Sequence, residues 1–224
     1  MRFVTLLGVA LLPLWLWAQP PCTFRLAKLK YEGGGDWYSN PSALPNLLGF
    51  LRAKTNTAVC PDEEVVEPGS AQLFQYPFVY LTGHGNVVFS PQEVENLRTY
   101  LQAGGFLLMD DNYGLHSYAK REIAKLFPDV PLREIPWDHP IYRQAFRFER
   151  GIPKIHEHDG KPAQAFGIEL EGRLVLVLTY EADLSDGWED PEVHHDPEAI
   201  RQQALQMGAN LVLYAIGGHT TQAN

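Results

Sequence analysis

Polar side chains that could do chemistry follow two short apolar runs in the middle of the chain. They are Thr82, His84 and Asn86 after the run at 78–81, and Asp110, Asp111 and Asn112 after the run at 106–109. A carboxyl group beside a second carboxyl can hold its proton near neutral pH, so Asp110 and Asp111 are candidate acid–base catalysts together with His84. Aspartates that follow strands also cap helices, and this alternative stays open.

A glycine-rich loop places three more polar and aromatic residues ahead of the first expected helix. Asp36, Trp37 and Tyr38 follow three consecutive glycines. These glycines resemble a phosphate-binding loop in composition only, because the Lys–Ser/Thr pair and the G-x-G-x-x-G spacing are both missing. We expect the loop to extend over the same edge as the strand-end residues. The predicted ligand-binding residues are Asp36, Trp37, Tyr38, His84, Asn86, Asp110, Asp111 and Asn112.

Two later segments have the residue types of a divalent metal site. The candidate ligands are His156, His158 and Asp159, and the segment 194–196 adds two histidines and an aspartate before the last expected helix. Imidazoles and carboxylates that leave one coordination position open could activate a water molecule. The spacing is not that of H-E-x-x-H, so a hydrogen-bonded loop scaffold without metal is the competing interpretation. The acidic segment 181–196 is otherwise typical of a solvated, charged loop.

The central elements can be predicted from their apolar pattern and from capping signals. Ser90, Pro91 and Glu93 form a capping box before a helical stripe that ends at Gly104 and Gly105. The flanking apolar runs are then parallel strands of one β-α-β unit. Ligands bind at the carboxyl edge of such open parallel sheets, which is the edge that carries the polar residues.

The remaining segments complete an α/β pattern. We expect further helices from a cap at Asn40 to Lys54, at 117–127 and at 198–216, the last capped by Asp196. Further strands are expected at 24–31, within 57–66, and at 132–135, 165–170 and 173–180. The last two strands are joined by Glu-Gly, which is a hairpin signal. The sequence therefore predicts a three-layer α/β fold with a parallel sheet, in a single domain over residues 19–224.

The first 18 residues have the pattern of a signal peptide. Arg2 precedes an apolar run at 3–17, and Ala18 provides a small residue near the cut. The run is short for a membrane span. We therefore expect an exported protein, in the periplasm or at the cell surface, that contacts the membrane only if this segment is retained.

Charge and cysteine content narrow the function classes further. The formal net charge is −9 over 224 residues with no basic cluster, which argues against binding nucleic acid. Export would allow Cys22 and Cys60 to form a disulfide, since each lies near the start of an expected strand. A bridge and two unpaired thiols both remain open.

Several longer motifs together resemble a bacterial family named domain of unknown function 4159. The motifs are G-G-G-D-W-Y-S-N-P, Y-L-T-G-H-G-N, G-G-F-L-L-M-D-D-N-Y-G, D-H-P-I-Y, K-I-H-E-H-D-G-K-P and D-L-S-D-G-W-E-D. The resemblance covers nearly the whole mature chain. It implies a fold similar to class I glutamine amidotransferases, which is a flavodoxin-like sheet with an inserted hairpin.

The resemblance also bears on activity. In amidotransferases a nucleophilic cysteine lies on a sharp turn after a central strand. The corresponding turn here is 109–114, and it contains no cysteine. The amidotransferase reaction is therefore not expected.

Two functions remain in competition. The first is a non-catalytic binding or assembly module of the cell envelope, with another envelope protein or a small polar ligand as its partner. The second is a metal-dependent hydrolase that uses the histidines and aspartates of the same edge. The missing cysteine favours the first, whereas the density of histidine, aspartate and tryptophan on one predicted edge favours the second. A divalent metal is the one cofactor that the sequence suggests.

Overall fold

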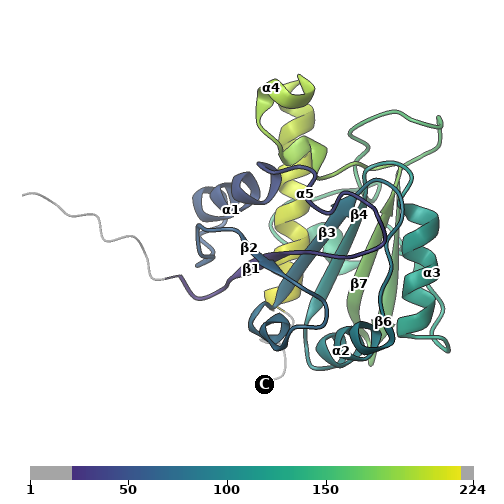
Figure 1. Cartoon of the computed structure of the whole chain (residues 1–224). Coiled ribbons are helices and arrows are strands. Elements are labelled where there is room, and N and C mark those ends of the chain that lie inside the picture. Colours follow the sequence, from purple (N-terminus) through teal and green to yellow (C-terminus); the bar gives the residue numbers. More distant parts are fainter. Residues whose placement is uncertain (1–21, 218–224) are drawn as a thin grey trace, which may run out of the picture.

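A seven-stranded sheet runs through residues 22–217, the part of the chain that the computed structural model describes (Figure 1). The strands are β1 (Leu26–Leu29), β2 (Glu64–Val66), β3 (Phe78–Gly83), β4 (Phe106–Asp111), β5 (Arg133–Glu134), β6 (Gln164–Leu170) and β7 (Arg173–Tyr180). Their order is β2-β1-β3-β4-β7-β6-β5. Strands β2, β1, β3, β4 and β7 are parallel and follow the flavodoxin-like order, while β6 and β5 extend the sheet in antiparallel pairing. The predicted signal peptide lies outside the described residues.

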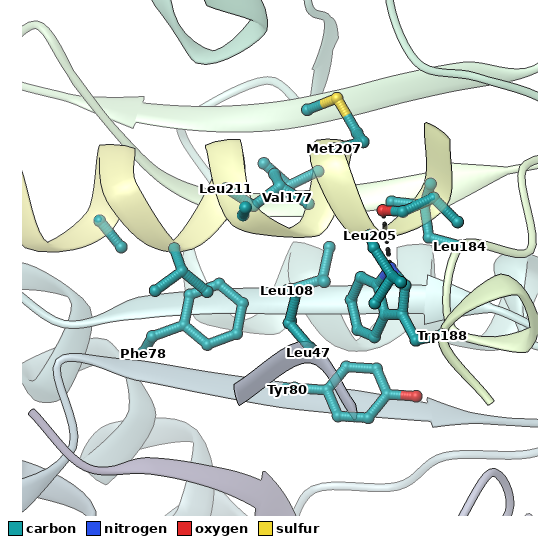
Figure 2. Close-up of a cluster of buried hydrophobic side chains, with 14 of the residues drawn as sticks. Leu47, Phe78, Tyr80, Leu108, Val177, Leu184, Trp188, Leu205, Met207 and Leu211 are labelled. Atoms are coloured by element: carbon teal, nitrogen blue, oxygen red, sulfur yellow. Dashed lines mark hydrogen bonds between the residues drawn. The ribbon is translucent and has the colours of Figure 1, made fainter. Parts of the chain in front are cut away.

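Helices cover both faces of this sheet, so the predicted three-layer α/β class is confirmed. The helices are α1 (Ala43–Lys54), α2 (Pro91–Gln102), α3 (His116–Leu126), α4 (Pro191–His194) and α5 (Glu198–Gly217), and the 3₁₀ turns are η1 (Ala71–Gln75), η2 (Pro140–Arg143) and η3 (Asp186–Trp188). Side chains alternate along β3, so Phe78 and Tyr80 pack with α1 and α5, while Val79 and Leu81 pack with α2 and α3. Figure 2 shows the cluster between α5 and the sheet.

The central β-α-β unit forms as the local signals predict. Ser90 and Glu93 make the reciprocal bonds of a capping box at the start of α2. Strands β3 and β4 are parallel, with Thr82 paired to Asp110. The predicted hairpin also forms between β6 and β7, and its turn residues Glu171 and Gly172 both have positive φ.

The start of α1 differs from the sequence prediction. The helix begins at Ala43, three residues after the predicted cap Asn40, which has a φ of 53°. The Asn40 amide instead donates to Ser185 Oγ at 2.9 Å and to Asp186 Oδ1 at 2.7 Å. Helix-start signals consider only nearby residues, whereas the partners of Asn40 are about 145 positions further along the chain.

The first half of the acidic segment is buried, which corrects the expectation of a solvated loop. We call residues 181–189 the cover loop. Its side chains at Ala182, Leu184, Ser185 and Trp188 are fully buried. The indole of Trp188 lies in the cluster of Figure 2 and donates to the Ala204 carbonyl oxygen at 2.8 Å. Because charged residues surround these apolar anchors in the sequence, composition alone predicts that the segment is exposed.

The two cysteines form a disulfide, which decides between the two alternatives that the sequence left open. Cys22 and Cys60 are bonded with their Cα atoms 4.7 Å apart, beside a parallel bridge between Phe24 and Val59. The bond therefore joins the chain ahead of β1 to the segment ahead of β2. Among the described residues, none of the helices has the length and apolar character needed to cross a bilayer.

Candidate functional site

The predicted polar edge is formed by the carboxyl ends of three neighbouring strands. Near the end of β3, Thr82 pairs with Asp110 of β4, and the last residue, Gly83, pairs with Asp111. The next strand, β7, brings Thr179 to the other side of β4, where its hydroxyl donates to Asp110 Oδ1 at 2.6 Å. Parallel pairing thus brings the strand-end residues together as the sequence predicts.

Asp110 is completely buried, and both of its carboxylate oxygens accept hydrogen bonds from other residues of the protein. Its Oδ2 atom accepts from the Ser185 backbone N–H at 2.7 Å and from the Ser185 hydroxyl at 2.6 Å. Burial raises the pKa of Asp110, although these bonds from Ser185 and Thr179 oppose the rise. With each of its oxygens engaged and with no exposure to solvent, Asp110 holds the cover loop against the strand ends.

Asp111 is the last residue of β4, and its side chain reaches the start of α3. Its Oδ1 atom accepts from the Leu115 backbone N–H at 2.8 Å, one residue before the helix. Burial raises the pKa of Asp111 to about 6, partly offset by this bond. The side chain is 3% exposed. The geometry is that of the helix-capping alternative, in which the carboxylate satisfies free amides at the first turn.

Asp186 is the second carboxylate that holds the cover loop in place. Its Oδ1 atom accepts from the side-chain amides of Asn40 at 2.7 Å and Asn112 at 2.8 Å. Burial alone would raise the pKa of Asp186, but bonds from His156 and Asn40 outweigh it and lower the pKa. The predicted ligand-binding residue Asn112 is therefore 3% exposed and lies beneath the loop, as Asp110 does.

Other predicted ligand-binding residues lie in exposed loops at the same edge. His84 donates its backbone N–H to Asp36 Oδ1 at 2.5 Å, and its Nδ1 lies 3.0 Å from Asp36 Oδ2. Burial opposes ionisation of Asp36, but the two contacts with His84 lower its pKa. The His84 side chain is 54% exposed. Tyr38 is 66% exposed, whereas Trp37 is partly buried against the core on the side of α2 and α3.

Asn86 joins these loops to helix α3. Its side-chain amide donates to the Gly33 carbonyl oxygen at 2.9 Å, and its Oδ1 accepts from Arg121 at 2.9 Å. The glycines of the loop allow the close approach, because a Cβ at Gly35 would lie 2.8 Å from the Asn86 carbonyl oxygen. The glycine-rich segment thus packs against the loop after β3.

His158 and Asp159, two of the predicted metal ligands, both contact the loop after β4. The imidazole of His158 stacks on Tyr113 with ring centroids 4.4 Å apart, and the Tyr113 hydroxyl lies 3.2 Å from Asp159 Oδ1. His158 Nε2 is 2.5 Å from Asp183 Oδ2. Burial raises the pKa of Asp183 to about 8, and the nearby Asp110 carboxylate adds to the rise.

His156, the third predicted metal ligand, lies between two carboxylates. Its Nδ1 is 3.0 Å from Asp186 Oδ2, and its Nε2 is 3.0 Å from Asp196 Oδ1. The hydrogen bond with Asp186 is the largest cause that raises the pKa of His156 to about 9. Asp196, the expected cap of α5, therefore directs its carboxylate to His156. His194 completes the group of described residues that could hold a metal, His156, Asp186 and His194.

Sequence reasoning did not assign to this edge the residues that close it. Asn40, Asp183, Ser185 and Asp186 become neighbours of the strand ends only when the cover loop folds back over them. The signal that could have found the loop is the pair Leu184 and Trp188, which are large apolar residues inside an acidic segment.

Comparison with known proteins gives a family and no characterised relative. None of the curated proteins compared with this chain matches it. A family model described as a domain of unknown function, DUF4159, matches residues 25–216. This range includes all the strands and the edge residues described above. The match covers most of the sequence, and the chain therefore belongs to the DUF4159 family, as its motifs predict.

Proposed function

We propose that the protein is a non-catalytic binding or assembly module of the cell envelope, which recognises its partner through the loops at the carboxyl edge of its sheet. The observation that supports this most is the state of Asp110. This carboxylate lies near the carboxyl end of β4, close to the turn where an amidotransferase-like fold would place its nucleophile, and it is buried and bonded to Thr179 and Ser185. A substrate would have to displace the cover loop to reach it.

The surface available to a partner lies beside the cover loop. We define the edge surface as Asp36, Tyr38, His84 and Tyr113. Tyr38 and Tyr113 are 66% and 50% exposed. The loops that carry these residues are adjacent, because a Cβ at Gly114 would lie 4.0 Å from the Gly85 backbone nitrogen. Exposed tyrosines with few rotatable bonds provide contact area at low entropic cost, which suits recognition of a protein or a polar ligand.

The envelope location rests on two supporting features. A disulfide between Cys22 and Cys60 is typical of proteins that fold in an oxidising compartment. The residues at 2–18 have the charge and apolar pattern of an export signal. A disulfide near the amino edge also leaves the edge surface at the other end of the strands accessible.

A binding experiment with matched variants tests this proposal. The mature protein would be immobilised and exposed to a solubilised envelope fraction, with Tyr38→Ala/Tyr113→Ala and Phe74→Ala tested in parallel. Phe74 is the control because it is 46% exposed on η1, which precedes β3 at the amino edge. We expect one partner to bind the wild type and Phe74→Ala, and to be lost from the double variant.

An activity screen tests the competing hydrolase function. Hydrolysis of an ester, phosphate, peptide or glycoside substrate that is abolished by Asp110→Asn would contradict a non-catalytic role. Equal partner capture by the wild type and the double variant would show that the edge surface is not the binding surface.

A further inference from the structure

Four side chains from three segments of the chain converge at the cover loop. His156 comes from the irregular segment before β6, Asp186 and Glu189 come from the cover loop, and His194 comes from α4. One donor atom from each of His156, Asp186 and His194 lies within 4.8 Å of those of the other two. We propose that this cluster is a structural site for a divalent transition metal such as zinc. The inference is independent of the proposed binding function.

The donor atoms are close enough together to bind one shared metal ion. His156 Nδ1 is 3.0 Å from Asp186 Oδ2, and His194 Nε2 is 3.3 Å from Glu189 Oε2. Donor atoms of His156, Asp186 and His194 all lie within 4.8 Å of one another. A tetrahedral zinc ion with bonds of roughly 2.0–2.1 Å holds its ligand atoms about 3.3 Å apart. His156, Asp186 and His194 would approach these spacings by side-chain rotation, and Glu189, in contact with His194, would be the fourth ligand.

Hydrogen bonds on the outer side of the cluster orient three of these ligands. The outer partners are Asn40 and Asn112 at Asp186 Oδ1, Ser42 at Glu189 Oε1, and Asp196 at His156 Nε2. Each ligand is thus held by one polar atom and directs the other towards the centre. Outer-shell partners of this kind, and carboxylates on the far nitrogen of a histidine in particular, are typical of metal sites.

The local charge also favours a cation. The side chains of Asp186, Glu189 and Asp196 are only 12%, 4% and 10% exposed. A divalent cation would offset two of these three negative charges. Imidazole ligands favour zinc and its neighbours, while calcium and magnesium favour sites made only of oxygen. Four protein ligands would close the coordination sphere, which indicates a structural rather than a catalytic ion.

Zinc titration of the untagged mature protein tests the site. The chain would be treated with a chelator, dialysed, and titrated with zinc by calorimetry and in thermal melts. We expect one zinc ion per chain, a higher Tm with zinc, and weaker binding of calcium. His194→Ala should weaken zinc binding by at least about tenfold and remove the Tm increase.

The neighbouring residue supplies a matched control. His195 is also an exposed imidazole, so His195→Ala should keep the zinc affinity of the wild type. Glu189→Gln keeps the side-chain shape and should also weaken binding, which provides a second test if His194→Ala disturbs the fold. A wild type that binds no zinc would overturn the proposal. Equal affinity in the wild type and both ligand variants, or tighter binding of calcium than zinc, would overturn it as well.

Discussion

At the scale of single residues, the two adjacent strand-end aspartates have separate structural partners. Asp110 is bonded to Thr179 and Ser185, whereas Asp111 accepts from the backbone at Leu115 before α3. Successive side chains of a strand point to opposite faces of a sheet, so adjacent carboxylates diverge rather than form an acid–base pair. Sequence reasoning singled out both residues as candidates, and their separate partners follow from this alternation.

Replacing Asp110 should reduce stability strongly. Asp110→Ala removes the acceptor of the Ser185 N–H and leaves buried donors on Ser185 and Thr179 without partners. We expect a loss of about 3 kcal/mol in the free energy of unfolding, measured by chemical denaturation. Asp159→Ala serves as a control, since Asp159 lies in an exposed loop. A loss no larger than in this control would show that Asp110 does not hold the cover loop.

Asp111 should make stability depend on pH in the acidic range. Its pKa is about 6 in the folded protein and close to 3.9 in an unfolded chain. Between these two pKa values Asp111 is protonated in the folded state and ionised in the unfolded state. The stability that this proton contributes is lost as pH rises from about 4 to 6. Asp111→Asn lacks this proton and keeps an acceptor for the Leu115 amide.

Denaturation of both proteins across this range checks the prediction. The stability of the wild type relative to Asp111→Asn should fall by at most about 3 kcal/mol between pH 4 and 6 and level off above pH 6. Parallel stability curves for the two proteins would mean that the pKa of Asp111 is not raised.

At the scale of elements, the parts set by local signals could be predicted, and the cover loop could not. The capping box at Ser90 and the hairpin turn at Glu171 depend on residues a few positions apart, and both are present in the structure. The cover loop depends on distant contacts, such as the bond from Trp188 to α5 and the bonds from Asn40 to Ser185 and Asp186. A window of neighbouring residues contains none of these partners.

Trp188 should therefore be the anchor of the cover loop. The side chain is fully buried, whereas Trp137 is 62% exposed. Trp188→Ala should lower the free energy of unfolding by about 3–5 kcal/mol, as is usual for large buried side chains. Trp137→Ala should cost less than about 1 kcal/mol. Equal effects of the two substitutions in denaturant titrations would argue that the loop is not held by its apolar residues.

At the scale of the whole molecule, the disulfide lies at the amino edge of the sheet and the polar residues lie at the carboxyl edge. The predicted three-layer class is correct because buried strands and amphipathic helices alternate in the sequence. The positions of His156, His158 and Asp159 could not be predicted, because they belong to an irregular segment between β5 and β6 whose path depends on packing. The structure places His156 beside Asp186, and it places His158 and Asp159 beside Tyr113.

The disulfide should stabilise the entire domain. It joins residues 38 positions apart, and the chain-entropy treatment gives about 4 kcal/mol for a loop of this length. Reduction of the wild type should lower the Tm. The double substitution Cys22→Ser/Cys60→Ser should lower the Tm as much as reduction does. The double variant should not respond to the reductant. An unchanged Tm on reduction, with free thiols confirmed, would contradict a stabilising bond.

The central claim is that the cover loop closes the carboxyl edge of the sheet. Hydrogen exchange of the cover loop tests this claim most directly. The Ser185 amide donates to buried Asp110 at 2.7 Å, and the loop at 157–161 is largely exposed. We predict that amides at 184–188 exchange orders of magnitude more slowly than those at 157–161. Exchange at the same fast rate in both segments would mean that the cover loop opens freely, and that Asp110 and its neighbours are accessible to a substrate.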